Sequence, residues 1–382
     1  MPWQETDPMN ERLKFIAAHQ SGLYSMSELC EHFGTSRKTG YKWLARYDEE
    51  GVDGLKDRSH APRECPHRME AAVEAALLSA RRAHPTWGPR KLLPWLSRHR
   101  PELELPAAST AGDLLARHGL VELRSRRSRP KHPRTPLLDA EAPNQVWTAD
   151  FKGEFRTRDG RYCYPLTVAD AHTRFLLCCD ALLSTGTIGA QASFERLFRE
   201  YGMPKAIRTD NGTPFSSPAL CGLSRLNVWW IKLGIAHQRI QPGKPQENGA
   251  HERMHRTLKA ETTRPPDLNQ IAQQKRFDGF RGEFNVERPH EALGQVPPAS
   301  LYTASTRTMP PVLPKPEYPG QYEKRSVRHT GAFRFRGREI FLSEVLASEW
   351  IGLEEIGDGV WSLYFCDYLL ARMDERTFKL RG

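Results

Sequence analysis

The segment Val146–Phe151, with the sequence VWTADF, decides the interpretation of the fold. Its apolar and aromatic residues predict a strand, yet Asp150 stands inside it. A buried carboxylate without a partner or a metal costs free energy, so a central strand rarely tolerates one. Asp210 directly follows the strand-like run Ile207–Thr209, and Glu252 stands on a predicted helix. Because ligands bind beyond the carboxyl ends of strands in open α/β sheets, these acids predict a functional site.

Outward from this segment, hydrophobic periodicity predicts alternating strands and helices. We expect strands at 145–155, 162–169, 174–181, 205–209 and 235–240, and helices at 187–201, 218–233 and 246–261. This is an α/β order, so the region 140–305 is predicted to form a mixed five-stranded sheet with flanking helices. Trp229 and Trp230 are expected in its core, and Cys178 and Cys179 are expected to be inert packing residues.

The three acids suit a site for hard divalent cations. A DNA phosphodiester is an anion that repels nucleophiles, and two cations held by carboxylate oxygens neutralise the charge that develops during its cleavage. They also activate water or a 3′-hydroxyl group and stabilise the leaving oxygen. Carboxylates without a cysteine or histidine set favour Mg²⁺ or Mn²⁺ over zinc. Asp150, Asp210 and Glu252 are therefore the expected ligands of two such ions.

The N-terminal region 1–62 predicts a helix-turn-helix domain. Residues 26–33 have apolar side chains at the spacing of one helix face, and the tripeptide GTS at 34–36 supplies a stop and then a cap for a second helix. A helix, a tight turn and a basic second helix are the plan that places the second helix in the major groove. An ordinary helical hairpin is the alternative interpretation.

The second helix, 37–47, is expected to bury Tyr41, Leu44 and Trp43. The residues expected to contact DNA are Arg37, Lys38, Lys42 and Arg46. The region 63–123 repeats the helical theme less clearly, and we interpret it as a second helix-turn-helix-like domain, with a packing spacer as the alternative.

The remaining segments complete the expected organisation. Residues 124–139 form a basic, proline-containing linker, in which Arg126 and Arg127 are placed to follow DNA phosphates; a plain interdomain tether is the alternative. Prolines predict a stiff linker at 306–329. Alternation of aromatic and polar residues, as around Phe333, predicts a small β-barrel at 330–382.

Composition restricts the class of protein. The net charge of +10 favours an acidic partner such as nucleic acid. No apolar run approaches the roughly 20 residues of a membrane span, and the N-terminus lacks the pattern of a secretory signal. The seven cysteines form no CxxC pair, so we expect reduced thiols in a cytosolic protein.

Region 140–303 resembles the catalytic core of insertion-sequence transposases and retroviral-type integrases, the DDE class with an RNase H-like fold. The matching stretches are WTADFKG at 147–153, RTDNGTPF at 208–215, PGKPQENGAHERMHRTLK at 242–259 and NVERPHEAL at 285–293. A helix-turn-helix start and a small C-terminal β-domain are also typical of bacterial members. The resemblance implies that Asp150, Asp210 and Glu252 bind metal and that Arg256 and Lys259 contact DNA near the active site.

Two features depart from the family pattern. The spacing usual in this class favours Glu247, because 36 residues separate it from Asp210, whereas 41 separate Asp210 from Glu252. The local pattern favours Glu252, since Arg256 and Lys259 follow it on the same helix face. The helix dipole is a sufficient structural reason for an acid at Glu247, so we assign Glu252. Helix-turn-helix segments stand in place of the His-His-Cys-Cys zinc module of retroviral enzymes.

Two rival functions compete with this interpretation. The run HERMH at 251–255 matches the HExxH pattern of zinc proteases, in which the histidines bind zinc and Glu252 is the general base. That interpretation needs a third ligand, finds none in a distinctive setting, and leaves Asp150 and Asp210 unexplained. The other rival is a regulator that binds DNA without catalysis, and the intact set of three acids argues against it.

The preferred hypothesis is a transposase that binds the terminal inverted repeats of a mobile DNA element. Water attacks the phosphodiester at the element end, and the freed 3′-hydroxyl group then attacks target DNA. The partners are therefore double-stranded DNA and further copies of the chain, at least a dimer, because two ends must be joined. We expect it in the bacterial cytoplasm, on the nucleoid when bound to DNA, without a membrane partner.

Overall fold

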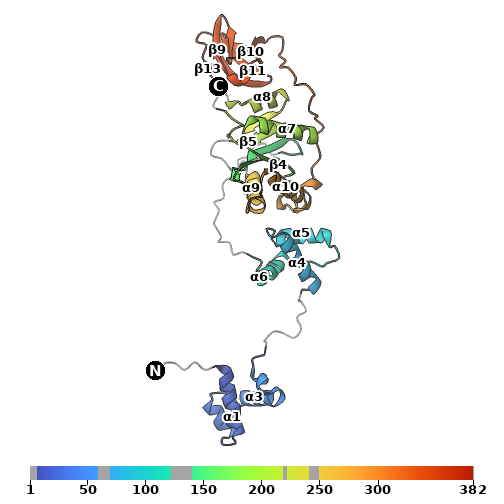
Figure 1. The fold of residues 1–382 in the computed structure, drawn as a ribbon, viewed down its shortest axis with the longest axis vertical. Helices are drawn as coiled ribbons and strands as arrows, with labels where there is room; N and C mark the ends of the chain where they lie inside the picture. The colour runs from blue at the N-terminus through green and yellow to red at the C-terminus, as the bar shows by residue number, and fades with distance from the viewer. Residues whose placement is uncertain (1–6, 59–68, 122–139, 218–221, 241–248, 382) are drawn as a thin grey trace, which may run out of the picture. The chain divides into compact units, whose positions relative to one another are not determined.

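The computed structural model describes residues 7–58, 69–121, 140–217, 222–240 and 249–381 (Figure 1). Three residues of the expected site, Arg126, Arg127 and the alternative ligand Glu247, lie outside these ranges. The chain divides into two compact units, Met1–Arg68 and Met69–Gly382. No helix among the described residues combines the length and the apolar character that a bilayer span requires.

The first unit is a three-helix domain. It contains α1 (Pro8–Gln20), α2 (Met26–His32), α3 (Arg37–Glu50) and the 3₁₀ turn η1 (Gly51–Leu55). The expected turn between α2 and α3 is confirmed: Gly34 has a φ of +60°, and the Ser36 hydroxyl caps α3 by accepting a hydrogen bond from the Thr39 N–H group.

Helix α3 packs on the other two helices through Gly40 and Leu44. A Cβ atom at Gly40 would lie 2.9 Å from the Phe15 ring and 3.1 Å from the sulfur of Cys30, so only glycine allows this close approach. The expectation that Tyr41 is buried is wrong, because its side chain is 58% exposed. The close contact at Gly40 turns the following residue outward.

The second unit begins with three helices, α4 (Ala71–Ala83), α5 (Pro89–His99) and α6 (Ala108–Arg117). They enclose a separate apolar cluster in which Trp87, Leu92 and Leu77 are fully buried. Gly119, with a φ of +66°, follows the end of α6 as the sequence predicted.

A mixed sheet forms the centre of the second unit. Its strands are β1 (Val146–Phe151), β2 (Phe155–Arg156), β3 (Tyr162–Asp170), β4 (Leu176–Leu182), β5 (Ala206–Thr209) and β6 (Ala236–Arg239). The order is β4-β3-β1-β5-β6, with the two-residue β2 also paired to β3. Strand β1 is antiparallel to β3 and parallel to β5, so it is central. The predicted mixed five-stranded sheet is present, with β2 as an addition.

Helices cover both faces of this sheet (Figure 1). On one face, α7 (Thr187–Tyr201) and α8 (Arg225–Lys232) pack on a cluster that contains Trp147, Trp230 and Phe194. On the other, α9 (Gly249–Thr262) and α10 (Gln270–Gly282) pack on β3 and β4. The expected burial of both tryptophans of α8 and of the Cys178–Cys179 pair is confirmed.

The C-terminal region is an antiparallel sheet that packs on the core. Its strands are β7 (Glu323–Ser326), β8 (Ala332–Phe335), β9 (Arg338–Phe341), β10 (Trp350–Gly357), β11 (Val360–Phe365), β12 (Tyr368–Asp374) and β13 (Leu380–Arg381). Five of them pair in the order β13-β12-β11-β10-β7, and β8 and β9 form a hairpin. Val228 of α8 shares the apolar cluster of this sheet, and Lys232 forms a 2.8 Å ion pair with Glu349. The antiparallel sheet is confirmed, and its closure into a barrel stays a prediction.

Candidate functional site

Asp150 lies on the central strand, where it pairs in register with Thr167 of β3. Its side chain is 18% exposed. Burial, together with the like charge of Asp210, raises the pKa of Asp150 to about 7. Lys152 opposes this rise, and Glu252 contributes a smaller increase. Asp210 and Glu252 therefore both lie near enough to Asp150 to disfavour its ionisation.

Asp210 directly follows β5, the parallel neighbour of β1. Because Asp150 lies near the carboxyl end of β1, both aspartates lie at the same edge of the sheet. The Gly212 N–H group donates to its carboxylate at 3.1 Å. A Cβ atom at Gly212 would lie 3.0 Å from that carboxylate, which explains why glycine occupies this position. The Asn211 side chain donates to the carbonyl of Ile240 beside β6 and holds the turn against the sheet.

Glu252 lies in the first described turn of α9. It is exposed, as are Arg256 and Lys259, whereas Met254 and Leu258 of the same helix are buried. The predicted common face of Glu252, Arg256 and Lys259 is thus the solvent-facing side of α9. The preceding residues 241–248 lie outside the described ranges.

Two buried histidines of α9 anchor the helix to the sheet. The Oγ1 atom of Thr167 lies 2.6 Å from the Nε2 atoms of both His251 and His255. The Thr167 hydroxyl donates to the Asp150 carbonyl at 3.0 Å, and in the tautomer protonated at Nε2 both imidazoles donate to Thr167. The Nδ1 atom of His251 also lies 2.9 Å from the Thr148 hydroxyl. These contacts place Glu252 next to the strand that carries Asp150.

Both imidazoles are neutral. Burial lowers the pKa of His251 to about 3 and that of His255 to about 2. The Nδ1 atom of His255 lies 3.7 Å from the Asp150 carboxylate, and because the ring is neutral this is a contact between an acceptor and a carboxylate, not an ion pair.

In the folded chain, Asp150 lies close to the two histidines of the HExxH pattern. One ligand atom each of Asp150, His251 and His255 lies within 4.8 Å of the others. Sequence reasoning missed this neighbour because Asp150 is far from the histidines along the chain. Since the Nε2 atoms already donate to Thr167, packing of α9 onto the sheet accounts for both histidines without zinc. The spacing of two histidines four residues apart was the available signal for this anchor.

The expected DNA-contacting residues of the first unit lie on α3. Arg37, Lys38 and Lys42 are exposed, and Arg46 is half-buried. The guanidinium of Arg46 lies 5.0 Å from the centre of the Trp43 ring. Tyr41 joins this basic surface, although the sequence interpretation placed it in the core.

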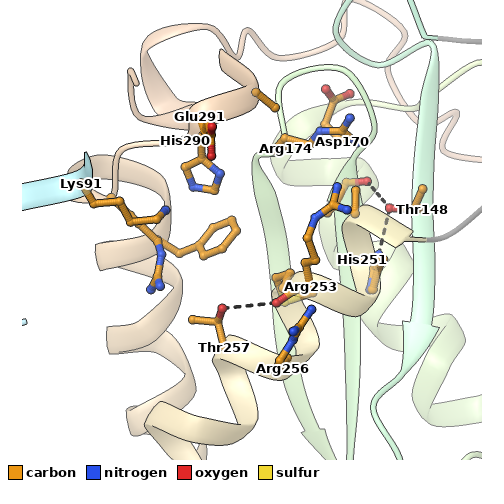
Figure 2. Close-up of a pocket in the computed structure, with 16 residues that line it drawn as sticks. Lys91, Thr148, Asp170, Arg174, His251, Arg253, Arg256, Thr257, His290 and Glu291 are labelled. Carbon is orange, nitrogen blue, oxygen red and sulfur yellow. Dashed lines mark hydrogen bonds between the residues drawn. The ribbon is translucent and has the colours of Figure 1, made fainter. Parts of the chain in front are cut away.

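A large basic pocket beside α9 was also missed. It has a volume of about 700 Å³ and lies between α5, α9, the β3–β4 turn and the segment that follows α10 (Figure 2). Lys91, Arg253 and Arg174 line it, and none of them was singled out from the sequence. They are dispersed along the chain, so only the fold brings them together.

Models of two kinds of domain match the sequence. Two models described as an integrase core domain match residues 140–245 and 233–298. A helix-turn-helix domain model matches residues 11–63, and a homeodomain-like domain model matches residues 39–115. The integrase matches cover the sheet that carries Asp150 and Asp210 and the helix that carries Glu252.

Curated relatives include proteins of insertion elements and retroviruses. An uncharacterized protein of insertion element IS476 from Xanthomonas euvesicatoria is 30% identical over 270 residues, which are 69% of this chain and 73% of that protein. A protein of insertion element IS407 from Burkholderia multivorans is 31% identical over 42% of this chain and 56% of its own length. The Gag-Pol polyprotein of baboon endogenous virus is 33% identical over 32% of this chain and 7% of that protein.

Solved structures similar to this chain include retroviral integrase cores. The HTLV-2 integrase catalytic core domain in complex with magnesium has a TM-score of 0.34 and 15% identity, over 42% of this chain and 98% of that chain. The BIV integrase core has a TM-score of 0.32 and 17% identity, over 42% of this chain and 93% of its own. From the insertion-element relatives and the domain models, the chain belongs to the insertion-element transposase-like proteins that join helix-turn-helix segments to an integrase core.

Proposed function

We propose that this chain is the transposase of a bacterial insertion element, which binds the terminal inverted repeats and catalyses metal-dependent cleavage of the DNA 3′ ends and strand transfer. The observation that carries the proposal is the approach of three acids from separate elements, since Asp210 and Glu252 both contribute to the raised pKa of Asp150. Several carboxylates close together on a partly buried strand are unfavourable unless a cation offsets their repulsion. Membership of the transposase-like family supports the same conclusion.

Asp150, Asp210 and Glu252 would hold two Mg²⁺ or Mn²⁺ ions. The donor set fits, because carboxylate oxygens are the ligands these hard cations prefer. The cations would also offset the burial of the Asp150 charge and its repulsion by Asp210 and Glu252. When bound, they would supply a charge that stabilises the attacking and leaving oxygens of phosphoryl transfer. The chain itself orients the acids through the hydrogen bond from Gly212 to Asp210 and the attachment of α9 to Thr167.

Basic residues would bind the DNA on both units. On α3, the residues proposed to enter the major groove are Arg37, Lys38, Lys42 and Arg46. Arg256 and Lys259 share the exposed face of Glu252, so they would hold phosphates near the reacting bond. Arg126 and Arg127 of the linker would contact further phosphates of the same DNA.

The proposed organisation keeps the domain limits inferred from the sequence: 1–62, 63–123, 140–305 and 330–382, joined by linkers at 124–139 and 306–329. The C-terminal sheet would close into a small barrel that adds contacts to DNA or to another subunit. Two element ends must be joined, so the active complex contains at least two copies of the chain. The proposed DNA substrate and the insertion-element relatives from bacteria support a location in the bacterial cytoplasm, at the nucleoid.

The test is cleavage and strand transfer on labelled DNA that carries the element ends flanking the gene, with and without Mg²⁺. We expect the wild type to cleave only with the metal, and Asp150→Asn, Asp210→Asn and Glu252→Gln to bind DNA but lose cleavage by at least about a hundredfold. Glu247→Gln is the matched control and is expected to cleave.

The outcomes separate the alternatives. If Glu247→Gln is inactive and Glu252→Gln is active, the chain is still a transposase, but its third metal ligand is Glu247 and not Glu252. If every protein binds DNA and none cleaves it, the chain is a non-catalytic regulator. A protein that contains zinc and hydrolyses casein would instead support the protease interpretation of the HExxH pattern.

A further inference from the structure

The basic pocket beside α9 is separate from the three acids. One helical turn is 3.6 residues, so Ala250, Arg253 and Thr257 occupy the side of α9 opposite to Glu252 and Lys259. The first three residues line the pocket, and the last two do not. Arg256 lies at the boundary, because it lines the pocket and also shares the exposed face of Glu252. Glu252 and the pocket are thus on opposite sides of α9, and Arg256 lies between them.

Five cationic side chains line the pocket, and they come from four parts of the chain. They are Lys91 of α5, Arg174 of the β3–β4 turn, Arg253 and Arg256 of α9, and Arg288 from the segment after α10. Figure 2 shows Lys91 entering from one side and Arg256 lying on α9 at the other. Such a distribution suits an extended anion better than one small phosphate, which could contact only a few of these groups at once.

The two acidic residues in the lining do not neutralise this charge. The Asp170 carboxylate accepts hydrogen bonds from the N–H groups of Asn144 and Thr173, both at 2.7 Å, and from the Thr173 hydroxyl. Glu291 lies 3.5 Å from Arg90, outside the pocket lining. Both acids therefore have partners outside the pocket, and Glu291 offsets only part of the positive charge around Lys91.

The cations themselves are only partly paired. Arg288 forms an ion pair with Glu261 at 3.0 Å. Lys91 donates to the carbonyl of Pro289, and burial together with the charge of Arg288 lowers its pKa to about 8. In the part of the chain that the structure describes, no acidic side chain lies within ion-pair distance of Arg253 or Arg256. Positive charge is thus crowded in the pocket, and an anion would relieve the repulsion.

A polar atom in the lining also lacks a partner. His290 lines the pocket, and its Nε2 atom is buried without a hydrogen bond to any described residue. The ring is hydrogen-bonded to the backbone of Phe284, and burial lowers the His290 pKa to about 4. In the neutral ring the Nε2 atom is an acceptor, so the lining also offers a position for one hydrogen-bond donor.

We infer that this pocket binds the sugar–phosphate backbone of the DNA strand that reaches the acids, through Lys91, Arg253 and Arg256. The inference rests on the proposed function and specifies where the substrate lies: the strand crosses α9 at Arg256 and continues on the side of the helix away from Glu252. Phosphate contacts of this kind fix the position of DNA without reading its sequence.

One experiment uses the wild-type protein without metal. Acylation of lysines by an N-hydroxysuccinimide ester is followed by mass spectrometry, with no DNA, with duplex DNA, with a single strand of the same sequence, and with inorganic pyrophosphate. We expect DNA to slow the acylation of Lys91 severalfold and to leave exposed Lys275 of α10 unchanged. Protection by pyrophosphate but not by DNA would overturn the inference, because the pocket would then bind small anions.

A second experiment measures DNA affinity against salt concentration in EDTA for Arg253→Gln and for the charge-matched control Lys275→Gln. Each phosphate contact contributes about 0.9 to the slope of log K against log salt, so Arg253→Gln is expected to lower the slope by about one and to weaken binding severalfold. Identical slopes for the two variants would overturn the inference, whatever the acylation shows.

Failure of this inference differs from failure of the proposed function. If the chain cleaves DNA with Mg²⁺ and Arg253→Gln has the same salt dependence as Lys275→Gln, the proposed transposase function stands. The inference that the pocket binds DNA is then wrong. If DNA protects Lys91 and Arg253→Gln lowers the slope, but the chain never cleaves DNA, the pocket is a DNA-binding site. The proposed catalytic function is then wrong.

Discussion

At the scale of single residues, Asp150 concentrates the electrostatic cost of the site. Burial and two neighbouring acids raise its pKa to about 7, from an ordinary value of 3.8. Between these two pH values the folded chain retains a proton that the unfolded chain releases. The contribution of Asp150 to the stability of the metal-free protein is therefore fully present below about pH 4 and is lost as the pH rises through 7.

Replacing Asp150 by Asn should therefore stabilise the metal-free protein above pH 7, because the amide carries no charge to desolvate. A tenfold change in an ionisation constant corresponds to about 1.4 kcal/mol, so the gain is on the order of a few kcal/mol. It should vanish near pH 4. Urea unfolding of both proteins in EDTA across this range measures the difference.

The control for this prediction is Asp170→Asn on β3. Its buried carboxylate accepts three hydrogen bonds, and an amide cannot accept them all, so this variant should lose roughly 1–3 kcal/mol. Equal effects of the two substitutions on the free energy of unfolding at pH 8 would contradict the electrostatic cost assigned to the ionised Asp150 carboxylate.

Thr167 tests the attachment of α9. Thr167→Val removes the oxygen that accepts from both His251 and His255, leaving two buried N–H groups without a partner. We expect a loss of roughly 2–4 kcal/mol in the free energy of unfolding, since each unsatisfied group costs about 1–3 kcal/mol. Thr167→Ser keeps the hydroxyl and should recover most of the loss. A Val variant as stable as the Ser variant would show that the histidines do not depend on Thr167.

At the scale of elements, α3 combines two neighbouring residues with opposite roles. Gly40→Leu should lower the stability of the first unit by about 1–3 kcal/mol, because the new side chain meets Phe15, Met26 and Cys30.

Tyr41→Ala should leave stability nearly unchanged and weaken DNA binding, since Tyr41 is exposed among the basic residues of the helix. Circular dichroism melts and DNA titrations of both variants distinguish the two roles.

The same helix shows why the sequence interpretation of Tyr41 failed. The period of 3.6 residues allows Tyr41 or Gly40 to face the core together with Leu44, and hydrophobicity favours the tyrosine. The structure selects Gly40, because close approach of α1 and α2 leaves no room for a side chain there. Hydrophobic patterns record which residues prefer burial, whereas the distance between helices decides which position is buried.

At the scale of the whole molecule, the two units have separate cores. The first has its own apolar cluster around Phe15, Leu29 and Leu55, and the second contains all the others. Calorimetry should therefore resolve two transitions. Gly40→Leu is expected to shift only one of them, and Thr167→Val only the other. A single transition moved by both variants would show that the units unfold together.

The sequence by itself determined the family resemblance, the α/β order of the core and the helix-turn-helix start, and it singled out the three acids proposed as the site. These features are carried by local patterns: strand and helix periodicity, caps such as Ser36, and acids at the ends of predicted strands. A local pattern can be interpreted without knowing which distant segments it meets.

Only the tertiary structure decided the rest. Thr148 and His251 are 103 positions apart, yet their contact helps to hold Glu252 beside Asp150. The raised pKa of Asp150, the third neighbour of the HExxH histidines and the basic pocket of Lys91 and Arg253 likewise depend on segments far apart in the chain. Burial, charge repulsion and close packing are properties of distances in space, and for residues so far apart along the chain those distances exist only once it has folded.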